Sequence, residues 1–143
     1  MNTKVFLTVI ILGLSTLFTA CEDDSTDSPV ITLHELGLDD SHEAHVGDDL
    51  HIDAEIIADG TIEKIVVELH AEDGDDELEV EFIDGYNGLK NAEFHEHVEI
   101  PATFTPGEYH FHLLVTDKEG NQSSVEAHVD IEEETNDGGD HDH

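Results

Sequence analysis

Residues 108–131 read EYHFHLLVTDKEGNQSSVEAHVDI, and this stretch decides the fold class. Apolar side chains occupy every second position from Tyr109 to Val115 and again from Val125 to Ile131. Alternation of this kind predicts two half-buried β-strands, over 108–116 and 122–131. Turn-forming residues lie between the two segments, so we expect them to form an antiparallel hairpin.

The same period of two recurs in short blocks from Pro29 onward. It predicts five further strands, over 30–34, 49–57, 62–70, 78–83 and 93–100. No segment keeps a period of 3.6 residues, so we expect no helix beyond a single turn. Seven short antiparallel strands predict an all-β, immunoglobulin-like β-sandwich. The pair Asp59-Gly60 leaves one alternative open, a tight hairpin that would make the fold a meander.

Charge and cysteine content exclude several classes of protein. The 143 residues include 37 Asp and Glu but only four Lys and no Arg, which gives a formal net charge of −33. Such a charge repels phosphates and anionic headgroups, so nucleic-acid binding and docking of a basic patch on a membrane are excluded. The single cysteine, Cys21, excludes an internal disulfide, a thiolate zinc site and an iron–sulfur cluster.

Residues 1–20 predict a lipoprotein signal peptide. Lys4 precedes an apolar stretch over 5–18, which small residues separate from Cys21. The segment from Val5 to Ala20 is short for a membrane-spanning helix, which needs about 20 residues. The run 17–21 resembles a bacterial lipobox, which implies cleavage before Cys21 and lipidation of that residue. An ordinary secretory signal with an incidental cysteine is the alternative.

Three segments follow the signal peptide. Residues 21–28 are polar and acidic and are expected to form a solvated tether, residues 29–132 the folded domain, and residues 133–143 a disordered acidic tail with two histidines. The acidic cluster after Cys21 resembles the export signal of surface lipoproteins in Bacteroidetes. We therefore expect an outer-membrane lipoprotein, held to the membrane through Cys21, at the cell surface or alternatively on the periplasmic face.

Several motifs resemble one protein family. The most specific stretch runs from Ile100-Pro101-Ala102 to Gly107-Glu108-Tyr109-His110-Phe111, and the segments 29–31, 50–55, 68–70 and 116–121 agree with it. Together they resemble the Bacteroidetes lipoprotein family called domain of unknown function 4625, over about residues 29–131. The resemblance implies a glycine-rich loop with histidines after His70, but this chain has acidic residues there, over 72–76. The family implies no activity.

Twelve histidines are the unusual feature of the composition. If consecutive strands alternate in direction, ten of them fall at or near one end of the sandwich, and only His95 and His97 lie elsewhere. The tether joins the first strand at the opposite end. We therefore expect the histidine-rich end to point away from the membrane.

The strand register predicts a metal site on one sheet. A hairpin closed by residues 117–121 sets His110 opposite His128 and His112 opposite Glu126, with Cβ atoms about 4.5–5.5 Å apart. His70, on the neighbouring strand, would flank them. The predicted ligands are therefore His70, His110, His112, His128 and Glu126, and a second candidate set is His51, Asp53, His95 and His97. Imidazoles with carboxylate support favour a divalent transition metal such as Zn²⁺ or Cu²⁺.

Two functions are open at this point. The chain is either a non-enzymatic lipoprotein that captures or buffers a divalent transition metal, or an immunoglobulin-like structural or adhesion-type module of unknown ligand, whose histidines are only polar surface. The sequence identifies no protein partner. It also contains no His-Glu-x-x-His, no Gly-x-Ser-x-Gly and no phosphate-binding glycine loop, so we expect no enzyme, no catalytic residue and no organic cofactor.

Overall fold

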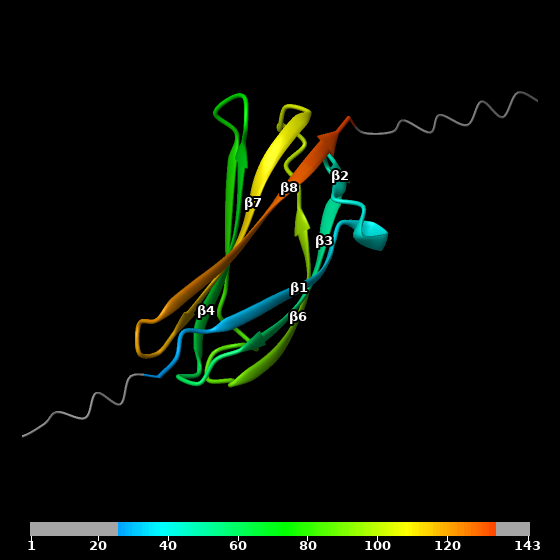
Figure 1. Ribbon diagram of the computed structural model, residues 1–143. Helices are drawn as coiled ribbons and strands as arrows, with labels where there is room; N and C mark the ends of the chain where they lie inside the picture. The colour runs from blue at the N-terminus through cyan, green and yellow to red at the C-terminus, as the bar shows by residue number, and fades with distance from the viewer. Residues whose placement is uncertain (1–25, 134–143) are drawn as a thin grey trace, which may run out of the picture.

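The computed structural model describes residues 26–133, which form eight strands in two sheets with a sandwich-like arrangement (Figure 1). The first sheet has the order β1 (Val30–Leu36), β3 (Asp49–Ile57), β6 (Asn91–Glu99). The second has the order β2 (Glu43–His45), β8 (Gln122–Glu132), β7 (Gly107–Asp117), β4 (Ile62–Ala71), β5 (Glu77–Phe82). The prediction of an all-β chain is confirmed. Within the described residues the only helical element is the short 3₁₀ turn η1 (Leu38–Asp40).

The strand count differs from the prediction by one. Strand β2, which we expected to be part of a loop, pairs in parallel with the end of β8 through Ala44 and Ile131. Three residues are too few for a period of two to be read from the sequence, and their partner lies more than 80 residues away. Strands β3 and β4 lie in different sheets, so Asp59-Gly60 closes no hairpin between them and the meander alternative is wrong.

The core lies between the sheets. It consists of the apolar residues that alternate along each strand and point inward. Tyr109, Phe111, Leu113 and Val115 of β7 are buried, as are the even-numbered residues 50–56 of β3. Burying a large apolar side chain contributes about 1.5–3 kcal/mol, so these positions fix which face of each strand turns inward. The histidines and most acidic residues are left on the two outer faces.

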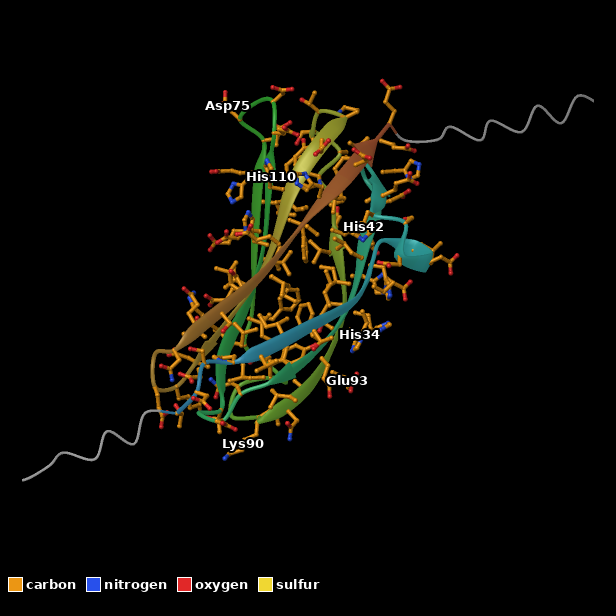
Figure 2. All side chains as sticks on the ribbon, viewed as in Figure 1. His34, His42, Asp75, Lys90, Glu93 and His110 are labelled. Atoms are coloured by element: carbon orange, nitrogen blue, oxygen red, sulfur yellow. The ribbon has the colours of Figure 1, made fainter. Side chains whose placement is uncertain are left out.

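The described chain begins and ends at opposite ends of the sandwich (Figure 1). Thr26 lies at the turn between β7 and β8, where the side-chain amide of Asn121 donates to its carbonyl oxygen over 3.2 Å. We call this the proximal end. We call the other end, where β4 and β8 finish and β3 and β7 start, the distal end. The proximal half holds all three lysines of the described residues: Lys64, Lys90 and Lys118 (Figure 2 labels Lys90).

A buried carboxylate closes the proximal turn. Asp117 is fully buried, and its Oδ1 accepts the backbone N–H groups of Glu119 and Asn121 over 2.9 and 2.8 Å. Burial raises the pKa of Asp117, but hydrogen bonds from the Asn121 amide and from these backbone groups outweigh it and hold the pKa below its usual value. The ionised carboxylate therefore stabilises the β7–β8 turn.

The described part of the chain contains no helix with the length and hydropathy needed to cross a bilayer. Cys21 and the residues before it, most of the predicted tether, and the tail histidines His141 and His143 lie outside the described residues.

Candidate metal centre

Three imidazoles meet on the outer face of β3 and β6. In the antiparallel register His51 lies opposite His97, and Asp53 lies opposite His95. Their ring centroids are 4.8 Å apart for His51–His95, 4.9 Å for His51–His97 and 5.8 Å for His95–His97. One nitrogen from each ring can be chosen so that all three lie within 4.8 Å of one another. We call these three residues the β3–β6 triad.

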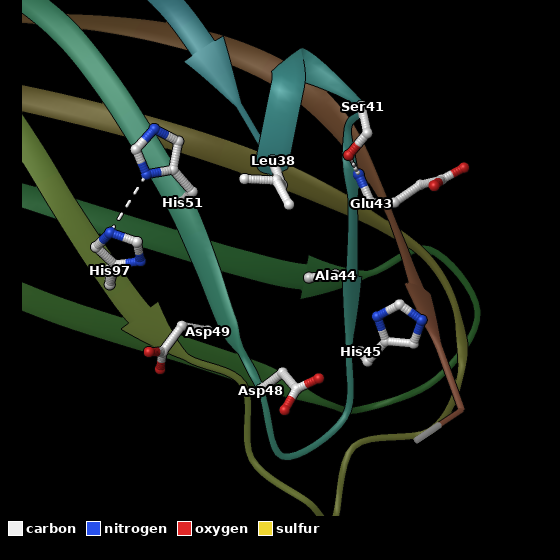
Figure 3. A pocket seen from close by; sticks show the side chains of 9 residues that line it. All are labelled: Leu38, Ser41, Glu43, Ala44, His45, Asp48, Asp49, His51 and His97. Atoms are coloured by element: carbon white, nitrogen blue, oxygen red, sulfur yellow. Dashed lines mark hydrogen bonds between the residues drawn. The ribbon is translucent and has the colours of Figure 1, made fainter. Parts of the chain in front are cut away.

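The distance between two of the triad nitrogens suits a shared metal ion. His51 Nδ1 lies 3.4 Å from His97 Nε2, the contact drawn as a dashed line in Figure 3. Two nitrogens bound to tetrahedral zinc at 2.0–2.1 Å are about 3.3 Å apart, so this pair needs almost no adjustment. His95 has room to turn, because 59% of its side chain is exposed against 13% for His51. A torsional change in His95 can therefore complete the site.

A carboxylate lies next to one ring nitrogen in two of the three imidazoles. His95 Nδ1–H donates to Asp53 Oδ2 over 3.0 Å, and His51 Nε2 lies 3.7 Å from Glu35 Oε2. A carboxylate that accepts one ring N–H fixes the tautomer and leaves the other nitrogen as a metal ligand. Asp53 therefore serves His95 as a supporting residue, and Nε2 of His95 is free for the ion. Glu35 lies beside Nε2 of His51, although 3.7 Å is longer than a hydrogen bond.

A hollow of about 440 Å³ adjoins the triad, and His51 and His97 form part of its wall (Figure 3). Glu43, Asp48 and Asp49 line it as well, while no lysine does. Carboxylates grouped without a counter-charge raise the local concentration of cations. The surroundings of the triad therefore favour the approach of a metal cation.

The predicted register of the second sheet is confirmed. His110 lies opposite His128 on β8 and opposite His70 on β4, and His112 lies opposite Glu126. The rings of His110 and His128 are 4.8 Å apart, and those of His70 and His112 are 6.0 Å apart. Figure 2 shows His110 on this sheet in the distal half.

Three of the four imidazoles of this sheet lie within 3.5 Å of a glutamate carboxylate: His70, His112 and His128. His112 Nδ1 lies 3.4 Å from Glu126, and His70 Nε2 lies 3.5 Å from Glu68. Among residues 26–133, two groups of three ligand atoms come within 4.8 Å of one another: the β3–β6 triad and the set Glu72, Glu108 and His128. His70, His110, His112 and Glu126 belong to neither group, so the site predicted for them stays a prediction.

The predicted position of two histidines is wrong. We expected His95 and His97 to lie outside the histidine-rich end, yet His97 lies directly opposite His51, near the start of β3, as the second candidate set requires. The reason is that β6 runs antiparallel to β3, so the late residues of β6 reach the distal half of the sandwich. The sequence analysis did not identify Glu35 as a neighbour of His51. It also did not identify Glu72 and Glu108 as potential metal ligands.

The chain matches the model of a protein family. A search among curated proteins finds no match for this chain. The family model described as Domain of unknown function (DUF4625) matches residues 19–132, which is most of the chain and includes every strand and both groups of potential ligands. The resemblance read from the motifs is therefore confirmed, and the chain belongs to the DUF4625 family.

Proposed function

We propose that this domain binds one divalent transition metal ion at His51, His95 and His97, and that it captures or buffers the metal without catalysis. The observation that carries the proposal is the 3.4 Å separation of His51 Nδ1 and His97 Nε2, with His95 held beside them by Asp53. Three ligands from two paired strands are set by backbone register, so the site needs little reorganisation to bind.

The ligand chemistry favours Zn²⁺ or Cu²⁺. Imidazole nitrogen suits both ions, whereas Ca²⁺ and Mg²⁺ need a shell of oxygens. Three protein ligands leave a coordination position for water or for an exchanging ligand. A site of this kind can take up and release its ion, which suits capture or buffering.

The same proposal includes a place for the protein in the cell. Lipidation of Cys21 would anchor the chain to the outer membrane, at the cell surface or alternatively on its periplasmic face. Thr26 lies at the proximal end. Four residues separate it from Cys21, and the five Cα–Cα steps between the two span at most about 18 Å. The proximal end would then stay close to the bilayer while the distal half faces outward. The fold that presents the site would be an immunoglobulin-like sandwich.

One observation favours the alternative function. His112 and His70 on the second sheet each have a glutamate nearby, as expected of imidazoles that only balance an acidic surface. If the triad behaves in the same way, the domain is a structural or adhesion-type module without a specific metal site.

A Zn²⁺ titration separates the two functions. The full chain, with His141 and His143 changed to alanine so that the tail cannot bind, should take up one tightly held Zn²⁺ at pH 7.5. His51→Ala should abolish this binding. His34→Ala is the matched control, because His34 is exposed on the same sheet at an irregularity in β1 and does not belong to the triad. Binding that survives His51→Ala unchanged would exclude the proposed site.

A further inference from the structure

A second group of potential ligands lies at the distal end of the other sheet. Glu72 follows the last residue of β4, Glu108 belongs to β7 and His128 to β8. The backbone N–H of Glu72 donates to the carbonyl oxygen of Glu108 over 2.9 Å, which extends the β4–β7 ladder by one residue. That bond holds the two glutamates side by side. One ligand atom from each of the three residues lies within 4.8 Å of the others.

The surroundings leave the two carboxylates without a lysine. All three lysines of the described residues lie in the proximal half, so imidazoles are the only groups nearby that can offset the negative charge. His128 Nδ1 lies 2.6 Å from Glu108 Oε1, and the ring of His110 is 4.8 Å from that of His128. Two carboxylates held together repel one another, and a shared cation removes that cost.

We propose that Glu72, Glu108 and His128 form a second divalent-metal site, with His110 beside it as a further nitrogen ligand. Glu108 has two oxygens, so one can keep the N–H of His128 while the other binds the ion. His128 then binds through Nε2. The site keeps His110 and His128 from the set predicted by the sequence. It has Glu72 and Glu108 in place of His70, His112 and Glu126.

The ligand chemistry of this second site differs from that of the triad. Carboxylate oxygens favour harder ions, so the site takes Mn²⁺ more readily than the three-imidazole triad does. The two sites share no residue and lie on different sheets. The second site is therefore independent of the function proposed above.

A Mn²⁺ titration followed by electron paramagnetic resonance tests this proposal. The protein is the full chain with His51, His141 and His143 changed to alanine, which removes the triad and the tail histidines. We expect about one bound Mn²⁺ per chain. Glu72→Gln with Glu108→Gln should weaken the binding at least tenfold, and His128→Ala should do the same without removing an acidic charge.

The matched control is Glu63→Gln with Glu79→Gln. It removes two exposed acidic groups that lie on the same sheet but do not belong to the second site. It should change the Mn²⁺ affinity less than threefold. An equal loss of affinity in the control and in the cluster variant would mean that the general acidity of the surface binds the ion, and would overturn the proposal. The absence of stoichiometric Mn²⁺ would overturn it as well. Neither result bears on the triad, which this background lacks.

Discussion

The outer faces of the two sheets carry the same local motif with different outcomes. Strand β6 has His95-x-His97 and strand β7 has His110-x-His112, both outward. β6 is an edge strand, and its histidines converge on one partner, His51. β7 is a central strand with neighbours on both sides, and His112 faces Glu68 and Glu126 there. Cross-strand partners, rather than spacing along a strand, therefore decide whether imidazoles can share an ion.

Removal of the shared partner should have the largest effect. His51 touches both other rings, so His51→Ala should lower the Zn²⁺ affinity by more than about 100-fold, beyond the 10–100-fold typical for loss of a supporting residue. A competition assay against a chelator of known affinity measures the change. An equal loss of Zn²⁺ affinity after His112→Ala would show that both faces bind the ion alike. It would contradict the conclusion that the triad alone brings its imidazoles together on one ion.

Acidification should have the next largest effect. A ligand imidazole must be neutral, and each one that has to lose a proton contributes up to tenfold in affinity per pH unit. The triad has three imidazoles, so we expect the Zn²⁺ affinity to fall at least about 100-fold between pH 7.5 and pH 5.5. Zn²⁺ titrations at the two pH values measure this. A pH-independent affinity would point to carboxylate ligands and against the triad.

The supporting carboxylate should have an intermediate effect. Asp53→Asn keeps the shape of the side chain but weakens the hydrogen bond to His95 Nδ1, so the Zn²⁺ affinity should fall by roughly 10–100-fold. Glu68→Gln is the corresponding change beside His70 on the second sheet and should leave the affinity within about threefold. If the two variants behave alike in the chelator competition, the arrangement of Asp53 behind His95 has no role in binding.

The fold itself should be insensitive to the pH change that releases the metal. Hydrogen bonds from Thr105 and the Tyr109 hydroxyl lower the pKa of Asp76, and the pKa of Asp117 is also lowered. A depressed pKa in the folded state contributes stability that is present above the unfolded value of about 3.9 and is lost as the pH falls through the folded value. Thermal unfolding of the metal-free chain should therefore show no loss attributable to these two groups between pH 7.5 and pH 5.5, and a loss below about pH 4. A collapse of the melting temperature at pH 5.5 would mean that metal release reflects unfolding.

The smallest effect should come from the face without a triad. His112→Ala should change the Zn²⁺ affinity of the β3–β6 triad less than threefold, because His112 lies on the other sheet and faces Glu126. The same chelator competition measures this small change. A tenfold loss would show that the second sheet supplies a ligand after all.

Those side-chain positions that depend on regular strand pairing could be predicted from the sequence. The five-residue turn 117–121 fixed the pairing of β7 with β8, so His110 was correctly set opposite His128. The second candidate set was also named from the sequence, and three of its four members form the triad. Its fourth member, Asp53, stands behind His95 as a support.

The sequence could not predict the residues whose positions depend on irregular backbone. Without the irregularity between Leu33 and Glu35, His34 would lie opposite Asp53 and Glu35 opposite Ile52. The shift instead sets Glu35 opposite Asp53, which brings it to the outer face beside His51. Nothing in the sequence marks this shift. Glu72 is similar, because its place beside Glu108 depends on one backbone hydrogen bond beyond the end of β4.

The most direct measurement is an anomalous difference map from crystals of the Zn²⁺-loaded protein, with data collected at the zinc absorption edge. If the triad binds zinc, a strong peak will lie about 2.0–2.1 Å from one nitrogen each of His51, His95 and His97. Zinc bound only elsewhere, with no anomalous density at these three imidazoles, would contradict the proposed site.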